Sequence, residues 1–355
     1  MMPHCANGLA CLGLQQQRAT IHRHDLITLL AGLYSTPRHD HPGSSLSSSS
    51  TTLPTPRIEV RPSPGRGLGL FTLDRIPAFT LIVKDDALLS IADGEDLPQL
   101  WDKYGALPPD MKAIFDNLAF SSDIAAVEPT MVSKLERRGY ASSQAHAMAR
   151  VSSRWQANAF KTGQPVSTSP GSTTWAYALF PNVARINHSC TPNACAHYRP
   201  PGAQVVYAVR DIEPDEEIEI AYFDPTMQDD DRQARAAAWG FKCSCPACID
   251  EGEVGRESDY GLDRFCVLSA LSVPPNVPIQ AAIDVARFFD HPWLAIALPK
   301  LYLALFDVLS KQHGEKSKLR DALQQALEWQ EKITGPDSPA SRDRRKALQE
   351  FDNRA

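Results

Sequence analysis

Hydrophobic and polar residues alternate with a period of two in several short runs of this chain. Ile58 and Val60 alternate with charged residues, as they would in an edge strand. Further apolar runs of strand length occupy residues 70–73, 79–83, 205–209 and 218–222. Turn residues separate these runs: a glycine-rich segment at 62–69, the sequence Arg-Ile-Pro-Ala at 75–78, and an acidic turn at 214–217. The pattern predicts two groups of short strands, one on each side of a long intervening segment.

The intervening segment changes to helical spacing. Apolar stripes at steps of three and four comprise Leu97, Leu100, Trp101 and Tyr104, and then Met111, Ile114, Phe115 and Leu118. Residues 131–160 continue the helical pattern, so we expect a helical insertion over about residues 92–157. Helical spacing returns after Cys248, with stripes at Leu294, Leu298, Leu301, Leu305 and Val308 and at Leu319, Leu323, Ala326 and Ile333.

The second of these stripes ends at Gly335, and Ser338-Pro339 has the residues of a new helix start. Residues 257–355 are therefore predicted to form a C-terminal helical region. We interpret it as a packed hairpin that supports the strands. A peptide-binding repeat stays open as an alternative, although two helix pairs are too few to establish a period.

The first 56 residues are predicted to be disordered, because residues 41–56 are mostly Ser, Thr and Pro and offer little to bury. A net charge of −6 argues against direct binding of nucleic acid, which needs an excess of Lys and Arg. The chain contains no run of about 18 consecutive apolar residues, so the sequence does not predict a membrane span. The N-terminus lacks a signal-peptide pattern, and its arginines leave a mitochondrial presequence as a minor alternative.

Cysteine spacing predicts a metal centre. No cysteine lies between Cys11 and Cys190, whereas Cys243, Cys245 and Cys248 crowd together. Thiols this close suit one zinc ion better than separate disulfides, which also favours a reducing intracellular compartment, nuclear or cytoplasmic. Structural zinc needs four ligands, so the residues alone leave Cys190, Cys195 and Cys266 as candidates for the fourth. A set of free thiols is the simpler alternative.

The segment Arg-Ile-Asn-His-Ser-Cys-Thr-Pro-Asn at 185–193 is the other unusual feature. A catalytic pair of His188 and Cys190 is disfavoured, because no glycine elbow presents a nucleophile. Gly67 and Gly69 could equally belong to a plain hairpin turn, and Tyr222 at a strand end could be a packing residue.

In the order of its motifs the chain resembles the SET-domain family: a glycine-rich turn, the 185–193 segment, an acidic turn between strands and a cysteine cluster. The resemblance is narrower to its SET-and-MYND branch and to fungal relatives that lack a MYND finger. The likeness covers residues 58–249. It implies an α+β fold of short strands with a pseudoknot, in a domain at 57–249 that ends in a post-SET cysteine cluster at 239–249. The insertion holds no cysteine over residues 92–154, so it cannot carry the MYND zinc finger.

The resemblance also implies the site. The residues that contact S-adenosylmethionine would be Arg66, Gly67, Leu68, Gly69, Asn158, Asn187, His188, Tyr222 and Phe241. Phe160 and Trp239 would line the lysine channel, and Tyr222 would orient the amine. The zinc ligands would be Cys190, Cys243, Cys245 and Cys248, which selects Cys190 for the fourth position.

The function implied is transfer of a methyl group from S-adenosylmethionine to the side-chain amine of lysine in a protein. A monomer acting on a histone or other protein is expected. Acidic residues at 213–219 and 229–231 would suit a basic histone tail, but we interpret them as solvated turns. The alternatives are a catalytically silent SET-like module that binds protein partners and, against the acidic balance, a zinc-stabilised nucleic-acid binder.

Overall fold

The computed structural model describes residues 55–92, 95–120, 124–169, 172–225, 227, 229–249, 266–267, 269–272, 277–288 and 292–353. All of them belong to one unit, Thr55–Ala355. The prediction of disorder for residues 1–56 falls almost wholly outside the described residues, as does the start of the predicted C-terminal region at 257–265.

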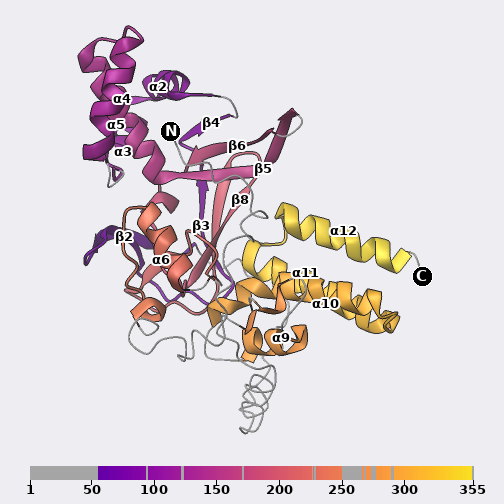
Figure 1. The fold of residues 1–355 in the computed structure, drawn as a ribbon. Coiled ribbons are helices and arrows are strands. Elements are labelled where there is room, and N and C mark those ends of the chain that lie inside the picture. The colour runs from indigo at the N-terminus through magenta and orange to yellow at the C-terminus, as the bar shows by residue number, and fades with distance from the viewer. Residues whose placement is uncertain are drawn as a thin grey trace. The chain divides into compact units, whose positions relative to one another are not determined.

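Short strands form three small sheets (Figure 1). The first contains β1 (Ile58–Ser63), β2 (Gly67–Thr72), β10 (Glu217–Ile220) and β7 (Asn187–His188), in that order. The second contains β3 (Leu81–Asp86), β9 (Ala203–Ala208) and β8 (Ala194–Arg199). The third contains β4 (Leu89–Ile91), β6 (Ser172–Leu179) and β5 (Ala159–Ser169). With helices before and after, this confirms the predicted α+β class, although the β5–β6 hairpin was not predicted.

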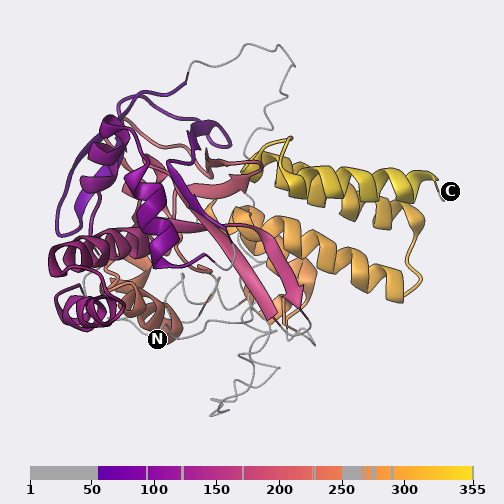
Figure 2. The same ribbon diagram turned by 90° about the horizontal axis from the view of Figure 1, so that it is seen from above.

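The helical insertion and the C-terminal helices flank these strands in both ribbon views (Figures 1 and 2). The insertion consists of α2 (Leu97–Gly105), α3 (Pro109–Asp116), α4 (Ile124–Arg137) and α5 (Ser142–Asn158). The C-terminal part consists of α9 (Ile279–Phe288), η3 (Pro292–Ala297), α10 (Leu298–Lys311), α11 (Lys316–Thr334) and α12 (Pro339–Asn353). Along the chain, η1 (Val183–Arg185) and α6 (Asp229–Ala238) lie between the insertion and the C-terminal helices.

Helix α11 docks on the second sheet through a glycine. A Cβ atom at Gly335, whose φ is 81°, would lie 2.2 Å from the Tyr207 hydroxyl oxygen. Only glycine permits this approach. One described segment, Pro292–Lys311, is long and apolar enough to cross a membrane by length and composition. The segment is 44% buried, with Leu298 and Leu301 fully buried on the side that contacts neighbouring helices.

Strand β3 begins two residues later than predicted. Phe79 takes a φ of 63° instead of extended geometry, and its amide donates to the carbonyl of Ala208 at 2.9 Å. Its ring then packs edge-on against Trp329 of α11, with centroids 5.8 Å apart. This contact joins residues 250 positions apart, so no local pattern could have predicted it.

The parallel pair β7–β10 determines where the candidate site lies. Asn187 is opposite Glu219, and His188 is opposite Ile220, so the segment predicted to form the pseudoknot lies beside β10. Buried Asp85 positions the chain that leads into β7. Its carboxylate accepts the amide hydrogens of Asn182 at 2.6 Å and Val183 at 3.0 Å, at the start of η1. Burial raises the pKa of Asp85, and these hydrogen bonds oppose that rise.

Candidate active site and metal centre

Four cysteine sulfurs converge at the end of the first sheet. Cys190 follows β7, and Cys243, Cys245 and Cys248 follow α6; all four Sγ atoms lie within 4.8 Å of one another, and all four residues are buried. The Cys190 sulfur is 3.8 Å from that of Cys243 and 3.7 Å from that of Cys248. A zinc tetrahedron with Zn–S bonds near 2.3 Å has edges of about 3.8 Å, so the donor set fits zinc. Neither Cys195 nor Cys266 belongs to the cluster.

The four thiols shift one another's pKa values in opposite directions. Contacts with the Cys190 sulfur lower the pKa of Cys243 and lower that of Cys245 to about 6, whereas the pKa values of Cys190 and Cys248 are raised. A buried group of four thiols cannot hold several negative charges without compensation. A divalent ion would supply that compensation, and four sulfur ligands would leave no open position for water, as in structural zinc sites.

A buried arginine and a histidine each contact one sulfur of the cluster. Arg232 of α6 is fully buried, and its Nη2 donates to the Cys248 sulfur at 3.8 Å while Nη1 donates to the Met227 carbonyl at 2.7 Å. His188 Nε2 lies 3.3 Å from the Cys190 sulfur. Donors of this kind around metal thiolates orient the ligands and reduce their charge. Sequence reasoning did not identify Arg232, because α6 carries Arg232 and Arg235 behind three aspartates, and charges in such a helix normally face solvent.

His188 also contacts Tyr222. The Tyr222 amide donates to His188 Nδ1 at 3.1 Å, which places the imidazole proton on Nε2, facing the sulfur. The Tyr222 hydroxyl donates to the Ile186 carbonyl at 2.7 Å. Burial raises the pKa of Tyr222 to about 12, with Arg66 opposing and Glu217 adding to the rise. The phenol therefore stays neutral at physiological pH with a fixed orientation.

Aromatic rings gather around Tyr222 and His188. The Tyr222 ring centroid is 5.2 Å from that of Trp239 and 6.2 Å from that of Phe241, the latter edge-on at 89°. Phe223 stacks on His188 at 4.3 Å. Trp239 is 43% exposed, so it forms the outer rim of the group. The structure thus brings together four of the predicted site residues: His188, Tyr222, Trp239 and Phe241.

Two other predicted residues lie further from these rings. Phe160 on β5 packs against the same apolar core as Tyr222, with its ring 6.1 Å from that of Phe180. Asn158 is buried at the end of α5, where its Nδ2 donates to the carbonyls of Ala119 at 2.8 Å and Arg154 at 2.7 Å. In this structure the Asn158 amide therefore joins backbone segments of the insertion.

The glycine segment closes on β10. Gly67 has a φ of 78°, and a Cβ at Gly69 would lie 2.2 Å from Glu217 Oε1. Asn187 Nδ2 donates to that same oxygen at 2.7 Å and to the Leu68 carbonyl at 3.1 Å. Gly69 therefore permits strand β2, β10 and the Asn187 segment to meet at one point.

Arg66 forms ion pairs with both Glu217 and Glu219. The two glutamate side chains are only 10% and 20% exposed, so the interpretation of residues 213–219 as solvated turns is wrong for them. Burial raises the pKa of Glu219 and is only partly opposed by Arg66. The signal was available, because Glu217 and Glu219 alternate with Ile218 and Ile220, which places both carboxylates on one face of a strand.

Residues 67–223 of the chain match the SET domain family. The chain is 40% identical over 112 residues to human N-lysine methyltransferase SMYD2, covering 31% of this chain and 23% of that one. It is 40% identical over 77 residues to histone-lysine N-methyltransferase ATXR2 of Arabidopsis thaliana, covering 21% and 16%. The chain thus matches less than a quarter of the length of these relatives.

Among solved structures, Rubisco LSMT bound to AdoMet matches at 13% identity with a TM-score of 0.31, covering 84% of this chain and 89% of that one. A putative histone methyltransferase of Plasmodium falciparum matches at 17% identity with a TM-score of 0.25, covering 48% and 96%. These scores are too low to inform the site. The matches in sequence confirm the resemblance over part of the chain: residues 67–223 match the SET domain, and the matched segments are similar to N-lysine methyltransferase SMYD2 and histone-lysine N-methyltransferase ATXR2.

Proposed function

We propose that this chain is a protein-lysine N-methyltransferase that uses S-adenosylmethionine. The observation that carries the proposal is Tyr222, a neutral phenol held on the Ile186 carbonyl within a group of aromatic rings beside the Asn187-His188 strand. The named relatives are lysine methyltransferases, and their matched segments support the assignment.

The residues around the glycine segment suit the methionine end of the cofactor. That end carries a carboxylate, an ammonium and a sulfonium, so it needs a cation, anions and neutral hydrogen-bonding groups nearby. Arg66, Glu217 and Glu219, and the Asn187 amide supply them within one connected network. Phe241 packs partly buried against the cysteine cluster and offers an aromatic face for adenine. When bound, the cofactor would supply an electrophilic methyl group.

The chain's own residues would then prepare the lysine amine. An ammonium has an ordinary pKa near 10.4 and holds no lone pair, so it must lose a proton before it can attack. Trp239 and Tyr222 would line the entrance and withdraw the amine from water, which disfavours its charged form. Because the Tyr222 proton is donated to Ile186, the phenol oxygen retains lone pairs that can accept a hydrogen bond from the amine. With a pKa of about 12 the phenol is an orienting group, and not a base.

The zinc ion would have a structural role and would take no part in the reaction. Its four sulfurs anchor the segment that carries Trp239 and Phe241 to the strand that carries His188. A catalytically silent module stays the alternative function, but nothing in the described residues favours it: Arg66 and Asn187 share Glu217 as a partner, and the Tyr222 and Phe241 rings contact each other.

The test is transfer of a labelled methyl group from S-adenosylmethionine to core histones and to proteins of a cell extract. Tyr222→Phe should label roughly a hundredfold less than the wild type, because a positioning contact is lost, while it folds and binds cofactor normally. Tyr198→Phe is the matched control, since Tyr198 also donates its hydroxyl to a backbone carbonyl at 2.7 Å, that of Pro201.

Equal labelling by wild type and Tyr222→Phe would remove Tyr222 from the mechanism. A wild-type protein that neither labels any substrate nor binds S-adenosylmethionine in calorimetry would refute the proposed activity and support the silent module.

A further inference from the structure

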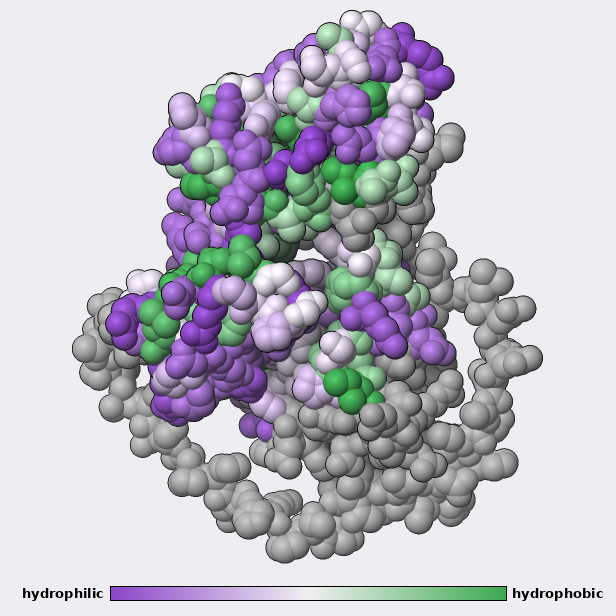
Figure 3. All heavy atoms as spheres, turned by 90° about the vertical axis from the view of Figure 1, so that its left-hand side faces the viewer, coloured by the Kyte–Doolittle hydropathy of each residue, from purple (hydrophilic) through white to green (hydrophobic). Residues whose placement is uncertain are grey.

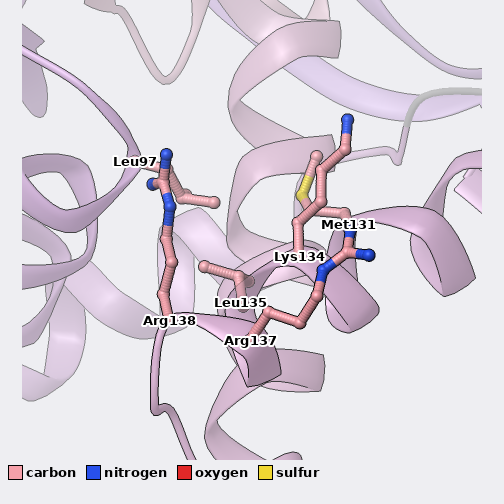
Figure 4. Close-up of a pocket in the computed structure, with 6 residues that line it drawn as sticks. All are labelled: Leu97, Met131, Lys134, Leu135, Arg137 and Arg138. Carbon is pink, nitrogen blue, oxygen red and sulfur yellow. The ribbon is translucent and has the colours of Figure 1, made fainter.

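A groove in the helical insertion has no role in the proposed reaction. Its volume is about 370 Å³, and it lies between the start of α2 and the C-terminal half of α4. Leu97, Met131 and Leu135 give it an apolar lining, and Lys134, Arg137 and Arg138 border it. Figure 4 shows Arg138 on one side of Leu135, with Arg137 and Lys134 on the other.

The three cations of the groove are exposed and available. Among the described residues, their side chains form no ion pair and no hydrogen bond with protein groups. Arg150 and Arg154 of α5 differ, because their guanidinium groups lie over the Phe120 ring at 5.0 and 3.9 Å. Residues 124–158 contain five Lys or Arg against two Glu, whereas α2 and the residues before it add Glu95, Asp96 and Asp102 against Lys103, so the basic character is confined to the α4 side of the groove.

Cations in the last turn of a helix are often explained by the helix dipole, which they stabilise. Lys134 and Arg137 do lie near the end of α4, at Arg137. That explanation accounts for the charges but not for the groove between them, where Met131 and Leu97 remain partly exposed beside buried Leu135. Figure 3, in which the insertion forms the upper half, shows apolar patches within a largely hydrophilic surface.

We propose that this groove binds an acidic segment of a partner protein that carries an apolar side chain. The apolar side chain would pack between partly exposed Leu97 and Met131, and carboxylates on either side would meet Arg138 and the pair Lys134 and Arg137. A volume of about 370 Å³ holds one or two side chains, which matches a short linear segment better than a folded surface. A duplex could meet the cations through its phosphodiesters, but its stacked bases would not reach the apolar lining, so duplex nucleic acid is the poorer partner.

The proposal is tested by fluorescence anisotropy with the full chain. The probe is a labelled pool of twelve-residue peptides in which every position is Glu, Asp, Leu or Phe; the control pool replaces Glu and Asp by Gln and Asn. Wild type should bind the acidic pool and not the control pool. The triple variant Lys134→Glu, Arg137→Glu and Arg138→Glu should bind on the order of tenfold more weakly or worse, because three ion pairs become repulsive.

A matched variant separates the groove from general charge. Lys311→Glu, Lys318→Glu and Arg342→Glu change the net charge by the same amount at exposed positions of α10, α11 and α12, and should leave binding within about twofold. Met131→Gln retains every charge of the groove, and it should weaken binding severalfold if the apolar contact contributes.

Three results would overturn the proposal. They are failure of the acidic pool to bind the wild type, equal loss of binding in the two triple variants, and tighter binding of a duplex DNA probe than of the acidic pool at the groove residues. The first denies the site, the second reduces it to overall charge, and the third assigns it to nucleic acid.

Discussion

Replacing Gly69 by alanine tests how the glycine segment is connected to β10. The new Cβ would lie 2.2 Å from Glu217 Oε1 and 2.8 Å from Glu217 Cδ, so the glutamate must move. Overpacking of this kind costs about 1–3 kcal/mol. Glu217 would also lose hydrogen bonds from Ser63, at 2.8 Å, and Asn187, at 2.7 Å, worth about 1 kcal/mol each. We therefore expect Gly69→Ala to lower the free energy of unfolding by about 3–5 kcal/mol and to weaken binding of S-adenosylmethionine.

Urea unfolding followed by tryptophan fluorescence measures the first effect, and calorimetry with S-adenosylmethionine measures the second. Gly105→Ala is the matched control, because no atom lies within 4 Å of a Cβ added at the end of α2. Alanine has the higher helix propensity, so this control should be neutral or stabilising by up to about 1 kcal/mol.

A double-mutant cycle then isolates the contact. In a Glu217→Ala background the atoms that obstruct the new Cβ are gone, so the cost of Gly69→Ala should fall to about 1 kcal/mol or less. If Gly69→Ala costs the same in both backgrounds, the clash with Glu217 is not its cause. If it costs no more than Gly105→Ala, the whole argument for this glycine fails.

Three further predictions concern other parts of the chain. Cys245→Ser should lower the zinc content of the purified protein measured by mass spectrometry, whereas Cys195→Ser should keep it; equal zinc in both would refute the ligand set. Gly335→Ala should destabilise the protein by about 2 kcal/mol in urea unfolding, because the new Cβ would lie 2.2 Å from the Tyr207 hydroxyl oxygen at a φ of 81°; an unchanged free energy of unfolding would contradict this contact. Burial lowers the pKa of His197 to about 4 from an ordinary 6.5, so the unfolded chain takes up this proton first and the free energy of unfolding should fall by about 1–3 kcal/mol between pH 6.5 and 4. In His197→Gln that part of the acid sensitivity should disappear, and an unchanged pH profile would contradict the assignment.

Local patterns were sufficient to predict most of the helices. The stripe that ends at Gly335 and the restart at Ser338-Pro339 correspond to the end of α11 and the start of α12, where the Ser338 hydroxyl accepts the Ser341 amide hydrogen at 3.0 Å. Such signals are local, because a cap, a glycine and an apolar stripe act within a few residues.

The connections between distant segments were less predictable from the residues. Three cysteines could be assigned to a metal site by spacing, but the fourth is 53 residues away from Cys243 and depended on the family resemblance. The ion pairs of Arg66 with Glu217 and Glu219 join the turn before β2 to a strand about 150 residues later, and no local pattern identifies the partner of either carboxylate. The alternation of Glu and Ile within β10 was the only local indication that both carboxylates lie on one face of a strand.

His188 connects the metal centre with the proposed reaction site in two contacts. Its Nε2 faces the Cys190 sulfur at 3.3 Å, and its Nδ1 accepts the Tyr222 amide hydrogen at 3.1 Å. An imidazole can satisfy both only as the tautomer protonated on Nε2, and a sulfur carrying negative charge favours that tautomer. Zinc bound to Cys190 would therefore hold the ring, and through it the Tyr222 backbone, although it lies outside the proposed chemistry. This arrangement explains why a thiolate cluster that offers no open coordination position lies directly behind the residue that we expect to orient the lysine.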